Sequence, residues 1–443
     1  MYKRVFVKSK SASLLVRHDH LVAHASIEPM PPIAADLAMP WDSLVSDPVA
    51  AIAAARAAYG ETFVVDSGLD RYLLTFDPTG VRSFYRLPES AASKGVADWR
   101  MLRRKMPDEI FEGRRVLPHD LFARDDVAKY LSQLRRALDA ELAALGDEGE
   151  LDVFELSRRL GHRIGLGSWA GPAGTAVEDF EVLLAAFDAL DGSEAFVRPD
   201  VMAALLESGK KEERAALDTI VAVIGGSVAD FDEADAYPLF ARIVDAWSDE
   251  PADVARTGVA RDVALLHVAS MSNLFAALGW ALVDLLEHPS YAERIVAGDQ
   301  DIAECCALES TRLAQRSLMA RYVLEPVVLE TTDGHYDVDR GVTVATLLPL
   351  LNTSAAPGLD EWRPQRWRRW RLADTSALAA EELVTAFGHG KHSCPAQPFS
   401  LAAMTVTMTA IFDALDLTPR WRQRPMPEPA HIGGVARAAQ ACP

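Results

Sequence analysis

The chain has 443 residues, of which 49% are hydrophobic and 25% charged, the profile of a globular protein with a large core. Its formal net charge of −19, from 64 acidic and 45 basic side chains, argues against nucleic acid or an anionic membrane as a partner, because both favour basic proteins. Its four cysteines, Cys305, Cys306, Cys394 and Cys442, form no disulfide framework that the sequence shows, so we expect a reducing, cytoplasmic location.

The first part of the chain mixes short strands and helices. Residues 1–20 contain no sustained apolar stretch, so we expect neither a signal peptide nor a membrane anchor. Thr62–Phe76 holds two apolar runs around the turn DSGLD, which predicts two strands, and Asp77-Pro78 then opens a helix. Apolar residues at helical spacing predict an amphipathic helix over Asp125–Leu145. Further helices are predicted at Val153–Leu166, Val177–Leu190 and Ala215–Gly225.

A long apolar segment follows at Val263–Leu286, and its length would just suffice to cross a membrane. The segment nevertheless contains several polar or charged side chains: His267, Ser270, Ser272, Asn273 and Asp284. We therefore predict a buried helix over about 259–287 that ends at His288-Pro289.

The last third of the chain begins with a predicted helix through Glu304–Ala314. Turns at Asp333-Gly334 and Arg340-Gly341, between Tyr322–Glu330 and the run VTVATLLPLL, predict a small sheet of hairpins. An irregular stretch spans 357–372, and a final helix is predicted from Cys394-Pro395 to about Leu415. The fold class is thus mainly α with a minor β-sheet. Because no linker divides the chain, we expect one domain over 1–443, with a β-richer part at about 1–80, a helical core at about 81–320 and a C-terminal part at about 321–443.

The segment FGHGKHSCP, residues Phe387–Pro395, carries the clearest chemical signal. Gly388 and Gly390 permit tight turns and a close approach of the backbone to a flat ligand. Cys394 precedes a proline at a predicted helix start, where free N–H groups and the positive helix end stabilise a thiolate. Zinc is disfavoured because no second cysteine pair is suitably spaced. The structural alternative is a lone cysteine in a glycine turn.

Two further motifs precede this segment. Glu309 and Arg312 are three residues apart, so they share a helix face and can pair. Arg366, in the run WRPQRW, could reach the same glutamate and lock the irregular stretch to the helix. The order is informative: Glu-x-x-Arg, a hairpin sheet, Pro-x-Arg-Trp, and then Phe-Gly-x-Gly-x-His-x-Cys-Pro.

In this order the motifs resemble those of the cytochrome P450 superfamily, soluble bacterial type. The resemblance implies the cytochrome P450 fold and haem b, with Cys394 as the axial thiolate ligand of the iron. It also implies that Phe387, Gly388 and Gly390 shape the haem-binding loop and that His392 meets a haem propionate. Three residues would form a structural triad behind the haem: Glu309, Arg312 and Arg366.

Other propionate-binding candidates lie outside the cysteine segment. Arg321 resembles an arginine of the prostacyclin synthase and sterol 7-alpha-hydroxylase group. A helix start at Pro107 would place Arg114 or Arg115 near a propionate. Trp99 and Arg103 match the usual Trp-x-x-x-Arg spacing of the family, but Pro107 argues against a continuous helix there.

The central helix departs from the family pattern Ala-Gly-x-(Asp/Glu)-Thr, whose acid and alcohol deliver protons to iron-bound oxygen. Here the run is Ala269-Ser270-Met271-Ser272-Asn273, so Ser272 takes the acid position and Asn273 the alcohol position. An amide can hydrogen-bond to oxygen or substrate but does not relay a proton as a hydroxyl does. The prostacyclin synthase type, which isomerises a peroxide without consuming O2, also has asparagine there. The structural alternative is a pair of polar residues at a helix kink.

The resemblance implies a monooxygenase that uses O2 and external electron donors, a ferredoxin and a ferredoxin reductase. Its substrate would be a small apolar or mixed-polarity molecule of the secondary-metabolite kind. We expect the pocket to be lined by Ala269, Ser272, Asn273, Ala276 and residues 317–320. Asn273 motivates a second hypothesis, an isomerase, dehydratase or peroxide-using enzyme that needs no reductase. A third is a haem-binding sensor or scaffold without an oxidative role.

Five arginines crowd into nine residues of this acidic chain: Arg363, Arg366, Arg368, Arg369 and Arg371. By resemblance this stretch lies on the cysteine side of the haem, where electron donors dock, and a basic patch would steer an acidic ferredoxin. The alternatives are internal roles for some of these arginines or a solvated loop. No role is assigned to Cys305, Cys306 or Cys442.

Overall fold

The computed structural model describes residues 31–116, 121–122, 127–146, 148–229, 231–232, 234, 236–315 and 317–421, so the expectations for residues 1–20 and for Cys442 lie outside it. The helices are α1 Pro48–Tyr59, α2 Pro78–Arg86, α3 Lys94–Leu102, α5 Val127–Ala144, α6 Val153–Trp169, α7 Gly171–Thr175, α8 Val177–Asp191, α9 Pro199–Glu207, α10 Lys211–Gly226, α11 Pro238–Asp245, α12 Ala252–Glu287, α13 Pro289–Val296, α14 Gln300–Ala314, α15 Leu348–Ser354 and α16 Gln397–Ala414. The strands are β1 Thr62–Ser67, β2 Asp70–Thr75, β3 Ala92–Ser93, β4 Leu318–Val323, β5 Val327–Thr331, β6 Gly334–Val338, β7 Val342–Leu347, β8 Trp367–Arg368 and β9 Arg371–Leu372.

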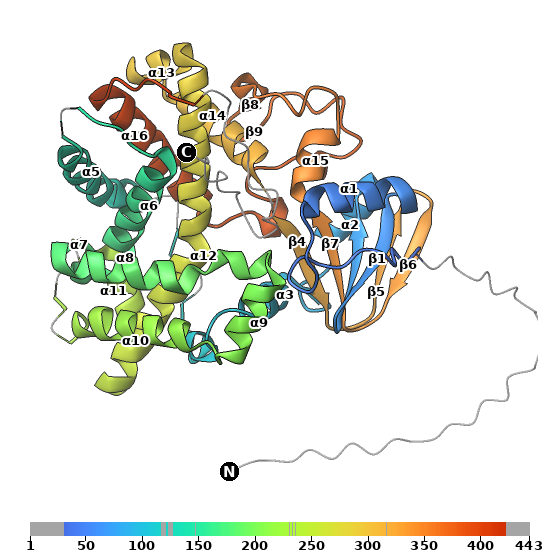
Figure 1. Ribbon diagram of the computed structural model, residues 1–443, viewed down its shortest axis with the longest axis horizontal. Helices are drawn as coiled ribbons and strands as arrows, with labels where there is room; N and C mark the ends of the chain where they lie inside the picture. The colour runs from blue at the N-terminus through green and yellow to red at the C-terminus, as the bar shows by residue number, and fades with distance from the viewer. Residues whose placement is uncertain are drawn as a thin grey trace, which may run out of the picture.

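The sheet lies at one side of the molecule and the larger helical part at the other (Figure 1). Five strands are ordered β1-β2-β7-β4-β3, while β5-β6 and β8-β9 form separate hairpins. The predicted hairpin at residues 62–76 is present, and β7 joins it in parallel to β2. The two chain segments of the sheet are far apart in sequence, so their pairing could not be predicted from local pattern.

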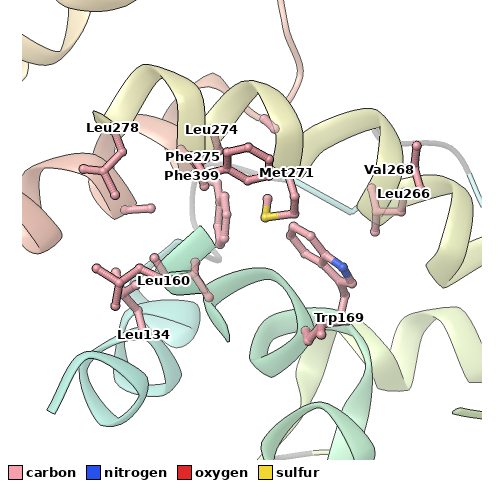
Figure 2. Packing of buried hydrophobic residues seen from close by; sticks show 14 of the residues in the cluster. Leu134, Leu160, Trp169, Leu266, Val268, Met271, Leu274, Phe275, Leu278 and Phe399 are labelled. Carbon is pink, nitrogen blue, oxygen red and sulfur yellow. The ribbon is translucent and has the colours of Figure 1, made fainter. Parts of the chain in front are cut away.

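The long helix α12 runs through the helical part and packs most closely against α6 (Figure 1). Two glycines of α6 make this approach possible. A methyl group at Gly161 would lie 2.7 Å from Phe275 Cβ, and one at Gly165 would lie 2.6 Å from Met271 Sδ. Figure 2 shows Met271 and Phe275 facing α6 within this core. The glycines weaken α6 by roughly 1 kcal/mol each relative to alanine, and the close packing offsets that cost.

By length and composition, α12 could cross a membrane, and it is the one such helix within the described ranges. However, 82% of its most apolar window is buried inside the structure. Its apolar character is therefore accounted for by its place in the core, as the sequence predicts.

Several boundaries differ from those predicted: α6 ends at Trp169 and not at Leu166, and α10 begins at Lys211 and not at Ala215. Three further differences follow. Helix α12 begins at Ala252, earlier than 259, because the polar residues and glycine of its first two turns, ADVARTG, interrupt the apolar pattern there. The strand β7 ends at Leu347, and the rest of VTVATLLPLL forms α15, with Pro349 in its first turn. Helix α16 begins at Gln397, so Cys394 lies in the turn before it and not at its first position.

A buried hydrogen-bonded chain connects α6, α8 and α12. Trp169 Nε1 donates to His267 Nδ1 at 3.2 Å, and His267 Nε2 lies 2.9 Å from His162 Nδ1. His162 Nε2 in turn lies 3.4 Å from Asp188 Oδ1. Because His267 Nδ1 accepts from Trp169, the neutral His267 ring carries its hydrogen on Nε2 and can donate it to His162 Nδ1. Burial, followed by the nearby His162, lowers the pKa of His267 well below its ordinary value.

We expect acid to destabilise the fold through His267. Below about pH 6.5 this side chain is protonated in the unfolded chain but stays neutral in the folded chain. The free energy of unfolding therefore decreases as the pH decreases. When the pH is lowered from 7 to 5, the free energy of unfolding should decrease less in His267→Gln than in the wild type. The difference between the two slopes should be up to about 1.4 kcal/mol per pH unit, measured by urea unfolding. His335→Gln, at an exposed position of β6, is the control. Equal pH slopes for His267→Gln and the wild type would contradict this assignment.

Candidate functional site

The loop before α16 is closed by main-chain contacts around two of its residues. Cys394 N donates to Phe387 O at 2.7 Å, which brings the two ends of FGHGKHSCP together. Gly388 has φ 83°, and a methyl group there would lie 2.3 Å from His392 O. Only glycine fits this left-handed turn. Thr385 Oγ1 accepts from Gly388 N at 2.7 Å and so fixes the start of the loop.

The Cys394 thiol is half-buried at the C-terminal end of this loop. Burial raises its pKa, whereas hydrogen bonds from the backbone N–H groups of Ala396 and Gln397 and the charge of Lys94 lower it, and the net direction is upward. The N–H donors expected for a thiolate are therefore present: Ala396 is the N-cap of α16 and Gln397 its first residue. A metal cation at the sulfur would supply the charge that keeps the thiolate.

A buried cation lies beside the loop. The Arg321 side chain is 1% exposed, its Nη1 lies 2.6 Å from His392 Nε2, and its Nε donates to Ala92 O at 2.8 Å. Its one carboxylate neighbour among the described residues, Glu89, is 3.4 Å away. Burial lowers the pKa of Arg321, partly opposed by Glu89. A buried guanidinium whose carboxylate partner is 52% exposed favours an additional anionic group, such as a carboxylate.

Three predicted residues meet behind the loop. Glu309 and Arg312, both fully buried, form a bidentate pair with two contacts of 2.8 Å. Arg366 Nε donates to Glu309 Oε1 at 2.7 Å. Trp367 Nε1 also donates to Glu309 Oε2 at 2.9 Å. Trp367 belongs to the run WRPQRW, but this contact was not predicted from the sequence.

Asn352, in α15, connects these residues to the cysteine loop. Its Nδ2 donates to Arg312 O at 3.0 Å and to Thr385 O at 2.9 Å, and its Oδ1 accepts from Thr385 N at 2.9 Å. Because Thr385 also holds Gly388, hydrogen bonds run from Glu309 to the Cys394 loop. Neither Asn352 nor Thr385 lies in a motif that sequence reasoning identified, and a lone asparagine in the run LLPLLNTS carries no signal.

The middle of α12 is accessible along one face. Ala269 is exposed and Ser270 and Asn273 are half-buried, although the adjoining turns of this helix are buried. Residues 269 and 273 are one turn apart and therefore share this face. The side chain of Ser272 lies outside the described part of the chain. Ala276 is fully buried, so the prediction that it lines the pocket is wrong.

Arg114 and Arg115 contact residues outside the Cys394 loop, and their role toward a propionate stays a prediction. Arg115 forms ion pairs with Asp249 and Glu250, and its guanidinium lies 5.1 Å from the centroid of the Trp247 ring. Arg114 Nε donates to Val116 O at 2.9 Å. Nearby surface carboxylates thus hold Arg115, and they could not be placed from sequence. The Arg321–His392 pair supplies a cationic site beside that loop.

These features fit a macrocycle that carries a metal and anionic groups. Cys394 presents a single sulfur, and among the described residues no group of three or more His, Cys, Asp or Glu side chains could hold a bare metal ion. Arg321 offers charge for a carboxylate. Gly390 has φ 57° and open space where a side chain would be. The accessible face of α12 is left free of core packing.

Comparisons with known proteins show which fold the chain shares. No family model matches the chain. The human 24-hydroxycholesterol 7-alpha-hydroxylase is 26% identical over 205 residues, which are 40% of this chain and 41% of that protein. CYP175A1 from Thermus thermophilus superposes with a TM-score of 0.62 at 20% identity, covering 89% of this chain and 95% of that one. A 6-coordinated cytochrome P450 from another strain of the same organism gives 0.60 at 19% identity, covering 89% and 98%.

We expect Glu309→Gln to destabilise the protein strongly. The substitution keeps the shape but leaves the buried guanidinium of Arg312 without its carboxylate, a loss of about 3–5 kcal/mol in the free energy of unfolding. Urea unfolding measures it. Glu361→Gln, which removes the partner of the exposed Arg363, is the matched control and should change stability by less than about 1 kcal/mol. Similar losses in both variants would contradict a structural role for Glu309.

Proposed function

We propose that this chain, which has the cytochrome P450 fold, is a haem-thiolate oxidoreductase that holds iron protoporphyrin IX through Cys394. The arrangement of the Cys394 loop beside the buried Arg321–His392 pair carries the proposal, because it places one sulfur donor and one undercompensated cation where such a macrocycle needs them. The expected location is the cytoplasm.

The bound haem would supply the redox chemistry at its iron. The protein's part is to hold and surround it. Cys394 donates the sulfur ligand, supported by the backbone N–H groups of Ala396 and Gln397. Arg321 and His392 bind a propionate, and the Glu309–Arg312–Arg366 triad, through Asn352 and Thr385, fixes the loop in place.

The favoured reaction is monooxygenation of a small apolar or mixed-polarity substrate with O2. The sequence similarity to a sterol hydroxylase supports this class, although the matched segment spans less than half of that protein. Asn273 lies on the accessible face of α12 with Ala269, where its amide can hydrogen-bond to substrate or to ordered water. A proton would then travel through water or a substrate hydroxyl, because the amide itself does not relay it.

The rival is an isomerase, dehydratase or peroxide-using enzyme. The same observation favours it: Ser272 and Asn273 replace the acid and alcohol of the proton-delivery pair. Such an enzyme would not reduce O2, so it would need neither this proton-delivery pair nor a reductase.

The proposed electron donor is a ferredoxin, reduced by a ferredoxin reductase, that docks on the β8-β9 hairpin. Arg366 is turned inward to Glu309, whereas Arg368, Arg369 and Arg371 are exposed. Arg369 and Trp370 have φ of 48° and 66°, a turn that costs side-chain-bearing residues roughly 1–2 kcal/mol each. Trp370 Nε1 donates to Glu304 Oε2 at 2.7 Å and helps to hold this turn. The hairpin thus presents a local basic surface on an acidic protein.

The reaction class can be tested with isotopically labelled oxygen. The haem-loaded protein is incubated under 18O2 with ferredoxin, its reductase and NADPH, using a panel of sterols and terpenoids that includes 24-hydroxycholesterol. We expect a product that carries 18O and requires the reductase. Asn273→Thr, which restores a hydroxyl, should raise the product formed per NADPH consumed. Product that lacks 18O and persists without the reductase would contradict monooxygenation and establish the rival.

A further inference from the structure

The buried hydrogen-bonded chain between α6, α8 and α12 has its inner end beside the candidate site. That end is Trp169, the last residue of α6, which is fully buried. Its ring lies 5.7 Å from that of Phe399, the third residue of α16, and the first N–H groups of α16 hydrogen-bond to the Cys394 thiol. A methyl group at Gly165 would lie 2.8 Å from Trp169 Cζ2 and 2.6 Å from Met271 Sδ. Trp169 therefore packs between α16 and the middle of α12 (Figure 2).

The outer end of the chain reaches solvent. It is Asp188, in α8, and 41% of its side chain is exposed. Arg158 forms an ion pair with this carboxylate. Partial burial raises the pKa of Asp188, but the hydrogen bond and charge of His162 and the charge of Arg158 outweigh it, so the net direction is downward. The chain thus ends in a carboxylate that is in contact with water and can exchange protons with it.

The hydrogen bonds of the chain all point from Trp169 toward Asp188. Trp169 Nε1 can only donate, so the neutral His267 ring accepts on Nδ1 and carries its hydrogen on Nε2, 2.9 Å from His162 Nδ1. Because His162 Nδ1 accepts, the neutral His162 ring carries its hydrogen on Nε2, 3.4 Å from Asp188 Oδ1. Each imidazole accepts on its inner nitrogen and donates from its outer one, which is the arrangement of a proton shuttle.

The chain can carry a proton outward but not inward. An indole N–H has no lone pair that could take up a proton from His267, so the chain cannot deliver protons to the site. His162 and His267 are at most 3% exposed, and the Phe187 ring lies 4.1 Å from that of His267. Tryptophan is among the side chains most easily oxidised by one electron, and loss of an electron makes its N–H strongly acidic. The direction of the chain therefore fits an oxidised Trp169 that releases its proton.

We propose that Trp169 is a redox-active residue that returns one electron to the oxidised haem and sends its Nε1 proton through His267 and His162 to Asp188. The proposal rests on the proposed function, because the haem is the oxidant of Trp169. It gives the chain a protective role. An oxidising equivalent that no substrate consumes leaves the haem through α6 and does not attack the Cys394 thiolate.

The step balances with a peracid as the terminal oxidant. The peracid RCO3H takes two electrons from the haem and two protons from solvent, its O–O bond breaks, and it leaves as RCO2H and water. Trp169 returns one of the two electrons and becomes a neutral radical by losing its Nε1 proton. His267 gains that proton on Nδ1 and gives up the one on Nε2. His162 does the same, and the last proton arrives at Asp188.

Electron paramagnetic resonance of the haem-loaded, substrate-free protein, frozen rapidly after mixing with peracetic acid, tests this. Wild type should give a tryptophan radical with the same spectrum in H2O and D2O, because a neutral indole radical has no exchangeable proton. Trp169→Phe should lose the radical, and peracetic acid should bleach its haem faster. Trp247→Phe is the matched control and should behave as wild type. Trp247 is a buried indole that donates to Asp262 Oδ2 at 2.8 Å and packs on Gly258, roughly 20 Å along α12 from Met271.

A second variant tests the proton path and keeps the tryptophan. His267→Gln retains an acceptor for the indole N–H, but an amide does not pass a proton on. Its radical should keep the indole proton, so its spectrum should narrow in D2O. A wild-type radical that narrows in D2O would overturn the proposal, as would a His267→Gln radical that does not.

The carbon monoxide spectrum of the same samples separates this inference from the proposed function. A haem-thiolate band in a wild type that forms no tryptophan radical, or whose radical survives in Trp169→Phe, would overturn the role of Trp169 alone. Absence of that band would contradict the proposed function, and the inference with it.

Discussion

The carboxylate of Glu309 is the contact around which the C-terminal half of the structure is organised. It is fully buried and accepts from Arg312, Arg366 and Trp367, so one side chain joins α14 to the irregular stretch that precedes the cysteine loop. A buried carboxylate is costly unless its oxygens are saturated with charged donors, which makes this arrangement close to all-or-none. Hydrogen bonds of Asn352 and Thr385 connect Arg312 to Gly388 at the start of the cysteine loop. The loop is closed by the hydrogen bond from the Cys394 amide to Phe387 O.

The opposite face of the site follows from helix packing. Gly161 and Gly165 let α12 approach α6 so closely that the apolar side chains on the α6-facing side of α12 are buried in the core. The buried chain of Trp169, His267 and His162 adds polar contacts on the same side. The face of α12 that carries Ala269 and Asn273 remains accessible, so the polar amide of Asn273 lies on that accessible face.

Sequence reasoning succeeded where a residue's role depends on near neighbours in the chain. Glu309 and Arg312 are one helical turn apart, and the cysteine segment is a continuous loop, so their contacts could be predicted from spacing. The start of α16 was placed three residues too early because the return of the Cys394 amide to Phe387 O is not encoded in helix propensity. The ion pairs of Arg115 with Asp249 and Glu250, which are far along the chain, could not be predicted from its position after a helix start. Asn352 acts only through partners that are distant in the chain, so no local pattern identifies it.

The central claim is that Cys394 ligates a haem iron as a thiolate. Its most direct test is the absorption spectrum of the dithionite-reduced protein under carbon monoxide, for wild type and Cys394→Ala. Thiolate ligation predicts a Soret band strongly red-shifted from the ordinary haem–carbon monoxide position in the wild type, lost in the variant. A band at the ordinary position in the wild type, or a red-shifted band that survives in Cys394→Ala, would contradict the account.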